Sequence, residues 1–228
     1  MFLVDGPKNQ GAQLRTSSRT IPKVRTIPKV LTVAGSDSGG CAGIQADLKT
    51  FGALGVHGMS VITSVTAQDT RRVYLTSKLP LENIKHQFEV VVNDLGVDAL
   101  KTGMLVSAEI IALVADRVKH FGIEQLVVDP VMNSTGGDSM IEPEAVEMLK
   151  SRLFPQALVV TPNLGEAELL TGKKIDSEKE IREVARAIFE LGPRSVLLKG
   201  GHPQHTEYCT DYFFDGVDFL KFSAPRVN

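Results

Sequence analysis

Short apolar runs rich in β-branched residues alternate along the chain with longer segments in which apolar residues recur every three or four positions. The runs have the length of buried strands and lie at residues 30–34, 60–66, 98–102, 125–129, 157–160 and 195–199. The periodic segments predict helices after Gly43 and at about 81–95, 107–119, 143–153, 165–170 and 178–191. This alternation predicts βαβ units, so we expect an α/β fold with a mostly parallel central sheet and helices on both faces.

The same pattern places a set of residues directly after the predicted strands. They are Gly35, Gln68, Met104, Val131, Asn163 and Gly200. Right-handed crossovers bring the C-terminal ends of parallel strands to one edge of the sheet, where open α/β sheets bind their ligands. We therefore expect a small-molecule site at this edge. Two further runs, 208–214 and 218–222, flank Asp215-Gly216 and predict a hairpin.

A glycine-rich segment follows the first predicted strand. Gly35, Gly39, Gly40 and Gly43 fall within nine residues and precede a helix. Backbone N–H groups at such a helix start can face an anion or a small ligand. The spacing matches neither a Walker A loop nor a G-x-G-x-x-G fingerprint. A tight connection in which glycine supplies positive φ angles explains the segment equally well.

Polar residues at three other strand ends have two interpretations each. Asn163 and Glu166 fit a capping box at a helix start, yet an amide and a carboxylate there also suit a hydrated magnesium ion near phosphates. Lys199 is either a solvated lysine or a contact for a nucleotide phosphate. Asp129 ends an apolar strand, where a carboxylate needs a cation or a helix N-terminus as its partner.

Composition narrows the expected partners. The chain of 228 residues has a formal net charge of -2, so no global basic field favours nucleic acid or an anionic membrane. Trp is absent and aromatic residues make up 6%, which argues against a base-stacking surface. No apolar stretch approaches the length of about 18 residues that a membrane span needs. Two cysteines, Cys41 and Cys209, give no disulfide framework and indicate a reducing compartment.

Residues 1–29 differ in kind from the rest of the chain. They are rich in Lys, Arg, Ser and Thr, contain Asp5 as their only acid, and show no hydrophobic period. We expect a disordered N-terminal extension and a cytoplasmic protein. A plastid transit peptide is the alternative interpretation of this basic leader. Residues 30–228 form the expected domain.

Six segments, taken jointly, resemble the hydroxymethylpyrimidine/phosphomethylpyrimidine kinases of thiamine biosynthesis, a ribokinase-like family related to the pyridoxal kinases. They are VAGSDSGGCAGIQADLKTFGALGVHGMSVITSVTAQDT, KTGML, VVDPVM, TPNLGEAELL, VLLKGGH and FSAPRVN. They occur in the family's order and cover nearly all of residues 30–228. The resemblance implies a ribokinase-like three-layer α/β/α sandwich.

The resemblance also implies an activity, its cofactors and its site residues. The activity is ATP- and Mg²⁺-dependent phosphorylation of 4-amino-5-hydroxymethyl-2-methylpyrimidine and then of its monophosphate. Matched by position, the family's pyrimidine pocket corresponds to Gly35, Ala42, Asp47, Gln68, Met104 and Val131. Its ATP contacts correspond to Asn163 and Lys199, and its magnesium–phosphate region to Asp129 and Glu166. A side-chain amide such as that of Gln68 can both donate to and accept from an aminopyrimidine edge.

Two positions depart from the family's pattern. Asp69 stands where the family usually has Asn, and Arg72 where it usually has Gly. A charge beside the pocket is expected to affect substrate preference. A pyridoxal or pyridoxamine kinase is therefore the alternative enzyme, although the segments AGSDSGGCAGIQADLKT and TAQDT favour the pyrimidine kinase.

The resemblance also raises an expectation about the end of the chain. In the family, a Thr-His-Gly-Ser/Thr-Gly-Cys stretch soon follows the segment like FSAPRVN. This stretch opens a helix and forms the anion hole for the transferring phosphate. The present sequence ends at Asn228. We expect a truncated domain without that catalytic motif, with one sheet face partly uncovered and little or no kinase activity. A non-catalytic pyrimidine-binding or regulatory fragment is the non-enzyme alternative. The resemblance further implies a homodimer when complete and, in some relatives, fusion to a thiamine-phosphate synthase domain.

Overall fold

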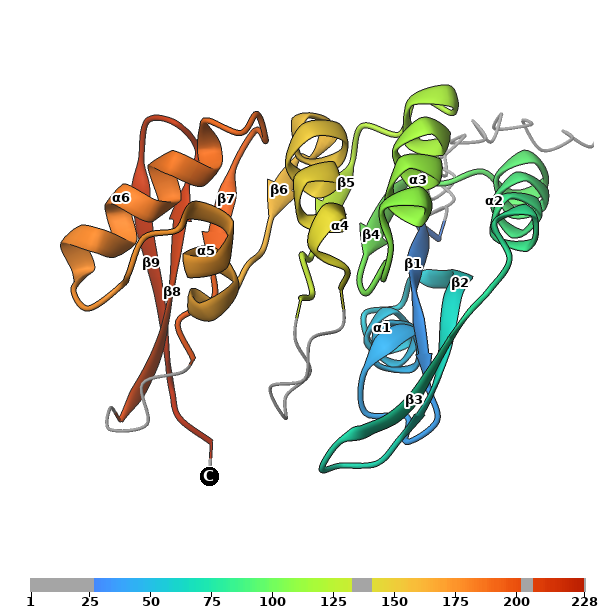
Figure 1. Cartoon of the computed structure of the whole chain (residues 1–228), viewed down its shortest axis with the longest axis horizontal. Helices are drawn as coiled ribbons and strands as arrows, with labels where there is room; N and C mark the ends of the chain where they lie inside the picture. Colours follow the sequence, from blue (N-terminus) through green and yellow to red (C-terminus); the bar gives the residue numbers. More distant parts are fainter. Residues whose placement is uncertain (1–26, 133–140, 202–206, 228) are drawn as a thin grey trace, which may run out of the picture.

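The computed structural model describes residues 27–132, 141–201 and 207–227, and nine strands in these ranges form one sheet. The sheet has the order β3-β2-β1-β4-β5-β6-β7-β8-β9 (Figure 1). The strands are β1 (Lys29–Asp37), β2 (His57–Gln68), β3 (Val73–Lys78), β4 (Ala99–Thr102), β5 (Leu126–Val128), β6 (Val159–Val160), β7 (Val196–Leu198), β8 (Tyr208–Phe214) and β9 (Phe219–Pro225). The six central strands, from β2 to β7, are parallel, and β3, β8 and β9 pair antiparallel at the two ends.

Six α-helices connect the strands in the described part of the chain. They are α1 (Gly43–Ala53), α2 (Leu81–Leu95), α3 (Ala108–His120), α4 (Pro143–Met148), α5 (Leu164–Thr171) and α6 (Glu178–Phe189). The helical path of α4 continues through a wide π-turn at Leu149–Leu153 and a 3₁₀ turn at Phe154–Gln156. Because parallel strands need such crossovers, the six central strands all end at the same edge of the sheet.

The main hydrophobic core lies between the sheet and the layer formed by α2 to α6. Val33 of β1 and Val61 of β2 are register partners on this face, and both are fully buried. Ile84 and Phe88, four residues apart on α2, are fully buried in the same cluster. Burying one such side chain stabilises the fold by about 1.5–3 kcal/mol. The buried face of α2 is therefore apolar at helical spacing, and this spacing is the pattern that predicted the helix.

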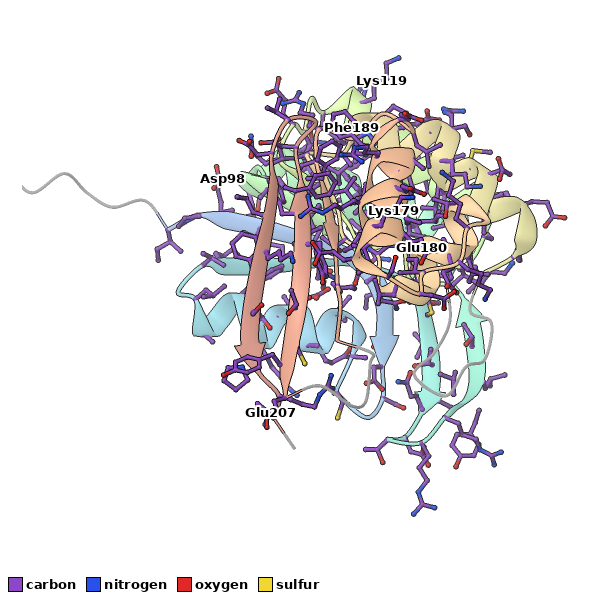
Figure 2. The ribbon with its side chains drawn as sticks, turned by 90° about the vertical axis from the view of Figure 1, so that its left-hand side faces the viewer. Asp98, Lys119, Lys179, Glu180, Phe189 and Glu207 are labelled. Carbon is purple, nitrogen blue, oxygen red and sulfur yellow. The ribbon has the colours of Figure 1, made fainter. Side chains whose placement is uncertain are left out.

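Helix α1 covers the opposite face of β1 and β2. The missing side chain of Gly58 on β2 admits Leu48 and Phe51 of α1, because a Cβ there would lie 2.9 Å from Leu48 and 3.1 Å from Phe51. In Figure 2, α1 (pale blue) lies on the other side of the sheet from α6 and α4. The fold is thus a three-layer α/β/α arrangement, as expected.

The α1 layer ends before the far half of the sheet. A groove on β6 to β9 is lined mainly by the apolar residues Leu158, Val159, Leu197, Phe213 and Phe222. Leu197 and Phe213 are register partners, and Phe222 is 56% exposed. Helix α6 contacts β7 and β8, but Val196, Leu198 and Phe214, which are buried in the main core, alternate along these strands with the residues of the groove. The expectation of a sheet face that is partly uncovered therefore agrees with the structure.

Two predicted details are wrong. The first strand does not end at Ala34 but runs to Asp37, because Ser36 and Asp37 pair with β2 after a bulge. Gly35 therefore lies within β1 rather than after it, and Gln68 is the last residue of β2. The sequence pattern also gave no strand at β3, whose residues are almost all exposed and so lack an apolar period.

The remaining predicted elements are present, although the bounds of several differ by a few residues, and α2 has the predicted range between Pro80 and Gly96. The hairpin at Asp215-Gly216 joins β8 and β9 as predicted. The first domain strand begins at Lys29, and most of the predicted extension, residues 1–26, lies outside the described residues. Among the described helices, none has the length and apolar character required to cross a bilayer.

Candidate functional site

A cavity of ≈ 330 Å³ opens at the edge where the central strands end. Its wall includes all six residues that were matched to the pyrimidine pocket, namely Gly35, Ala42, Asp47, Gln68, Met104 and Val131. They come from β1, α1, β2 and the turns after β4 and β5, so the topology brings together residues far apart in sequence. Asp129 also lines the cavity, whereas Asn163, Glu166 and Lys199 do not.

The glycine-rich turn is folded around its own acidic side chain. The carboxylate of Asp37 accepts hydrogen bonds from the backbone N–H groups of Gly39 (2.7 Å), Cys41 (2.9 Å) and Ala42 (2.8 Å). Burial acts to raise the pKa of Asp37, but these N–H groups outweigh it and hold the pKa below its usual value. The N–H groups of Gly39, Cys41 and Ala42 are therefore already satisfied, which favours the turn interpretation.

Two glycines allow the turn to close over the cavity. Gly43 has a φ of +54° at the start of α1, and a side chain there would collide with the carbonyl oxygen of Gly35. At Gly35 itself, a Cβ would lie 2.6 Å from Met104 and 2.9 Å from Ser64. Gly43 therefore needs to be glycine, whereas at Gly35 a side chain would require Met104 and Ser64 to move.

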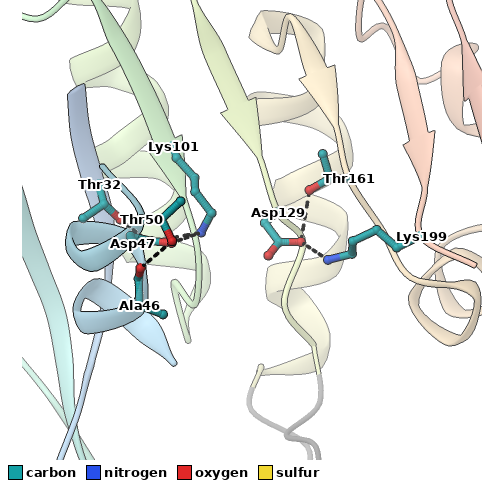
Figure 3. Close-up of polar contacts among 8 residues, drawn as sticks. All are labelled: Thr32, Ala46, Asp47, Thr50, Lys101, Asp129, Thr161 and Lys199. Carbon is teal, nitrogen blue, oxygen red and sulfur yellow. Dashed lines mark hydrogen bonds and ion pairs between the residues drawn. The ribbon is translucent and has the colours of Figure 1, made fainter. Parts of the chain in front are cut away.

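An ion pair forms one wall of the cavity (Figure 3). Asp47 on α1 faces Lys101 on β4, whose Nζ is 3.0 Å from Oδ1 and 3.1 Å from Oδ2. The Thr32 hydroxyl donates a 2.6 Å hydrogen bond to Oδ2 of the same carboxylate. Lys101 was not among the site residues predicted from the sequence. The signal was present, since a lysine one residue before the end of a buried strand faces the ligand-binding edge.

Gln68 is held at the cavity by the glycine-rich turn. Its backbone N–H donates to the Ser38 hydroxyl (2.9 Å), and that hydroxyl donates back to its carbonyl oxygen (3.0 Å). Its side-chain Oε1 accepts a hydrogen bond from Thr66 (3.2 Å). The amide nitrogen has no partner in the described part of the chain, so it is available to a ligand.

The two positions that depart from the family's pattern lie beyond Gln68 at the tip of the β2–β3 hairpin. Asp69 accepts from the backbone N–H groups of Arg71 (2.8 Å) and Arg72 (3.0 Å) and from the Tyr74 hydroxyl (2.8 Å). The Arg72 guanidinium lies over the Tyr74 ring, 4.3 Å from its centroid. These contacts tie the hairpin tip together, and neither Asp69 nor Arg72 lines the cavity.

A second ion pair links the cavity to the neighbouring strands (Figure 3). Asp129, one residue after β5, accepts from Lys199 Nζ (2.7 Å) and from the Thr161 hydroxyl (3.1 Å) at the same oxygen, Oδ1. Lys199 follows β7 and is joined to Asn163 by an isolated parallel bridge. The predicted partner for the strand-end carboxylate is thus a lysine.

Asn163 and Glu166 form the predicted capping box at the start of α5. Glu166 N donates to Asn163 Oδ1 (2.9 Å), and Asn163 N donates to Glu166 Oε2 (2.8 Å). Glu166 is only 5% exposed. Burial raises its pKa, the Asp129 carboxylate adds to this effect, and the Asn163 N–H and the Lys199 charge oppose it.

The acidic residues do not by themselves form a closed metal site. In residues 27–132, 141–201 and 207–227, no three His, Cys, Asp or Glu side chains come close enough to ligate one metal ion. Asp129 and Glu166 nevertheless influence each other electrostatically, so two carboxylates share one lysine. An added cation would relieve this excess of negative charge.

Comparison with known proteins agrees with this geometry. The sequence model of the phosphomethylpyrimidine kinase family matches residues 37–228. The hydroxymethylpyrimidine/phosphomethylpyrimidine kinase of Rhizobium meliloti is 50% identical over 198 residues, which are 86% of this chain and 74% of that protein. The thiamine biosynthesis bifunctional protein ThiED of Geobacter sulfurreducens is 50% identical over 197 residues, and the chain spans only 40% of its length.

Solved structures show the same fold. The phosphomethylpyrimidine kinase of Clostridium difficile superimposes with a TM-score of 0.79 at 45% identity, over 86% of this chain and 84% of that one. The pyridoxal kinase of Staphylococcus aureus, in complex with AMP-PCP and pyridoxal, gives 0.80 at 35% identity, over 88% and 72%. The fold is thus ribokinase-like, as the resemblance implied. With the family's sequence model matched over most of its length, the chain belongs to the phosphomethylpyrimidine kinase family.

Proposed function

We propose that the protein containing this chain transfers phosphate from ATP to 4-amino-5-hydroxymethyl-2-methylpyrimidine and then to its monophosphate. The observation that carries the proposal is the gathering of the six family-matched residues around one cavity, with Asp129 in the same wall. A cavity of ≈ 330 Å³ suits a single-ring substrate with short substituents. The polar groups in its wall suit a heteroaromatic ring that carries an amino group.

The Asp129–Lys199 pair supports the phosphate side of this proposal. Asp129 lines the cavity. Lys199 does not, but its Nζ lies 2.7 Å from Oδ1 of Asp129. A substrate hydroxyl at Asp129 and a nucleotide phosphate at Lys199 would then be neighbours. Phosphoryl transfer depends mostly on such positioning and on neutralising the charge of the phosphates. Asn163, bridged to Lys199, would contribute to the same phosphate contacts.

The described carboxylates fit a magnesium ion. Mg²⁺ prefers oxygen ligands and is usually held by one or two carboxylates together with water and substrate phosphates. Asp129 has one oxygen, Oδ2, outside its bonds to Lys199 and Thr161, and Glu166 is a buried carboxylate with a raised pKa. These two residues would hold the ion, which neutralises phosphate charge when it is bound.

Phosphorylation of pyridoxal is the second candidate, because pyridoxal kinases share the fold at 35% identity. Asp47 favours the aminopyrimidine. A carboxylate accepts a hydrogen bond from an amino group, whereas the corresponding position of pyridoxal carries an aldehyde, which is itself an acceptor. Removing a matched polar contact of this kind typically discriminates strongly between substrates.

The test is a competition between the two substrates. Phosphoryl transfer from ATP is measured on the aminopyrimidine and on pyridoxal, and calorimetry measures the binding of each to residues 1–228. We expect tighter binding of the aminopyrimidine and, where turnover is measured in the protein containing this chain, a kcat/KM at least about tenfold higher. Equal or better use of pyridoxal would overturn the assignment. Binding of neither compound would overturn both candidates.

A further inference from the structure

We infer that Lys101 is a substrate-contacting residue, which donates a hydrogen bond to the ring nitrogen next to the amino group. This inference rests on the proposed aminopyrimidine substrate. It deepens that proposal by assigning a role to a side chain of β4 that lies in the cavity wall. Three observations on the described residues carry it.

The first observation is the place of the ion pair. Both Asp47 and Lys101 line the cavity, and their side chains are only 13% and 27% exposed. A charged pair held at a cavity wall in this degree of burial has already lost much of its hydration. Polar groups of a ligand therefore meet less competition from water there, and their hydrogen bonds are stronger than at an open surface.

The second observation is the count of donors and acceptors. The Lys101 ammonium has three N–H donors, and its partners among the described residues are the two oxygens of Asp47. One donor remains. The Asp47 carboxylate can accept about four hydrogen bonds, and it receives those of Lys101 and of Thr32. The pair thus retains one donor and at least one acceptor, about 3 Å apart.

The third observation is access to the amine. Gly103 also lines the cavity, and a Cβ on it would lie 3.6 Å from Lys101 Nζ. The same Cβ would lie 2.9 Å from the Ala34 Cβ, so a side chain is not readily accommodated. The glycine leaves the lysine amine next to open cavity space.

These features match one edge of a 4-aminopyrimidine. On that edge an amino group, which donates, stands beside a ring nitrogen, which accepts. The amino group would donate to Asp47 while the ring nitrogen accepts from Lys101. The free amide nitrogen of Gln68 would serve another polar atom of the ring. Pyridoxal carries a phenolic oxygen at the position of this ring nitrogen, and that oxygen also accepts hydrogen bonds, so discrimination against pyridoxal rests on the contact between Asp47 and the amino group.

The experiment combines affinity with a direct view of the ring nitrogens. Calorimetry and ¹⁵N NMR are performed on residues 1–228 with ¹⁵N-labelled 4-amino-5-hydroxymethyl-2-methylpyrimidine. The variants are Lys101→Met and Lys101→Gln, the latter keeping a polar side chain in case the first fails to fold. The matched control is Lys78→Met, which removes the lysine of a 2.6 Å ion pair with Glu142 that lies outside the cavity.

In the wild-type chain we expect the resonance of the ring nitrogen beside the amino group to shift on binding, as a hydrogen bond forms. Lys101→Met should weaken binding about 10- to 100-fold and return that resonance towards its free position, while the other ring nitrogen changes less. Lys101→Gln should weaken binding less, and Lys78→Met should change neither quantity.

Three results would overturn the inference. Unchanged affinity in both Lys101 variants would do so. Weaker binding with an unchanged resonance would show that Lys101 acts only by positioning Asp47. If the wild-type chain binds pyridoxal but not the aminopyrimidine, the proposed function fails together with the inference. If wild type binds the aminopyrimidine and only the lysine effect is missing, the inference alone fails.

Discussion

Asp129 and Lys199 are in contact across a whole strand: their carboxylate and amine are 2.7 Å apart although β6 lies between β5 and β7. Each residue follows its own strand and bends towards the other at the edge of the sheet. The pair therefore joins the wall of the cavity to the part of the edge that was matched to ATP. Asp129 lines the cavity and Lys199 does not, so the two residues of the pair lie on different sides of the proposed site.

Replacing Lys199 separates the two halves of the proposed site. Lys199→Met should weaken the binding of ATP about 10- to 100-fold, because a charge-assisted contact to phosphate is lost. Binding of the aminopyrimidine should change by less than about threefold, since Lys199 is not in the cavity wall. Calorimetry with each ligand measures both effects. An equal loss for the two ligands would contradict this division of roles.

The Asp37 carboxylate should contribute to stability in a pH-dependent manner. Asp37→Asn removes a charge that satisfies backbone N–H groups in the turn, and we expect a loss of about 1–3 kcal/mol in the free energy of unfolding at pH 7. The folded-state pKa is lowered, so this contribution is present above the unfolded value of about 3.9 and disappears as pH falls through the folded value. Urea unfolding between pH 7 and pH 2 measures it.

The control for this substitution is Asp94→Asn. Asp94 is exposed on α2, and its side-chain carboxylate has no hydrogen-bond partner in the described ranges. Its loss should change stability by less than about 0.5 kcal/mol. A difference between Asp37→Asn and wild type that stays constant down to pH 2 would mean that the turn does not depend on the ionised carboxylate.

Glu166→Gln should maintain or increase stability and weaken ligand binding. Because burial raises the pKa of Glu166, its ionised form destabilises the fold, and the stability of wild type falls as pH rises from about 4.3 through the folded-state pKa. Gln avoids this cost and still suits a capping box. The variant should therefore be at least as stable as wild type at pH 7, while Mg²⁺-dependent ATP binding becomes weaker.

Glu168, two residues further on α5, provides the opposite case. The backbone N–H of Ile175, together with Lys174, holds the pKa of Glu168 below its usual value. Glu168→Gln should therefore lower stability at neutral pH and leave ATP binding unchanged. Thermal unfolding of both variants over pH 4 to 8 measures the two signs. The same sign for both would contradict the assigned electrostatics.

Two glycines of one helix should respond oppositely to alanine. Gly43→Ala places a Cβ against the carbonyl oxygen of Gly35 at a positive φ, and we expect a destabilisation of more than about 1 kcal/mol. Gly52→Ala meets open space in the last turn of α1 and should stabilise by about 0.5–1 kcal/mol. Denaturant midpoints give both values. A stabilising Gly43→Ala would show that the turn relaxes freely.

The sequence predicted best those elements whose burial is periodic. Helix α2 is an example, because Pro80 and Gly96 mark its ends and Ile84 and Phe88 mark its buried face. Strand β3 escaped prediction because both of its faces are exposed, which removes the alternation that identifies a strand. The bulge in β1 escaped for a related reason: Ser36 and Asp37 read as turn residues, yet pairing with β2 keeps them in the sheet.

Pairwise relationships at the site were harder to predict than positions. Motif matching named Asp47, Asp129 and Lys199, but not that each carboxylate has its own lysine. Lys101 and Asp47 are 54 residues apart, and only the sheet order makes them neighbours. Similarly, the glycines left two explanations open until the backbone showed Asp37 within the turn. Such partnerships depend on three-dimensional register, which local patterns do not encode.

The Asp37 turn has a consequence for ligand competition. A carboxylate attached to the same chain acts as a tethered ligand, with an effective concentration on the order of millimolar or higher. Free phosphate must displace it to reach the N–H groups of Gly39, Cys41 and Ala42. Phosphate-bearing inhibitors should therefore gain little affinity from these three N–H groups, and selectivity must be sought at the ring-binding wall.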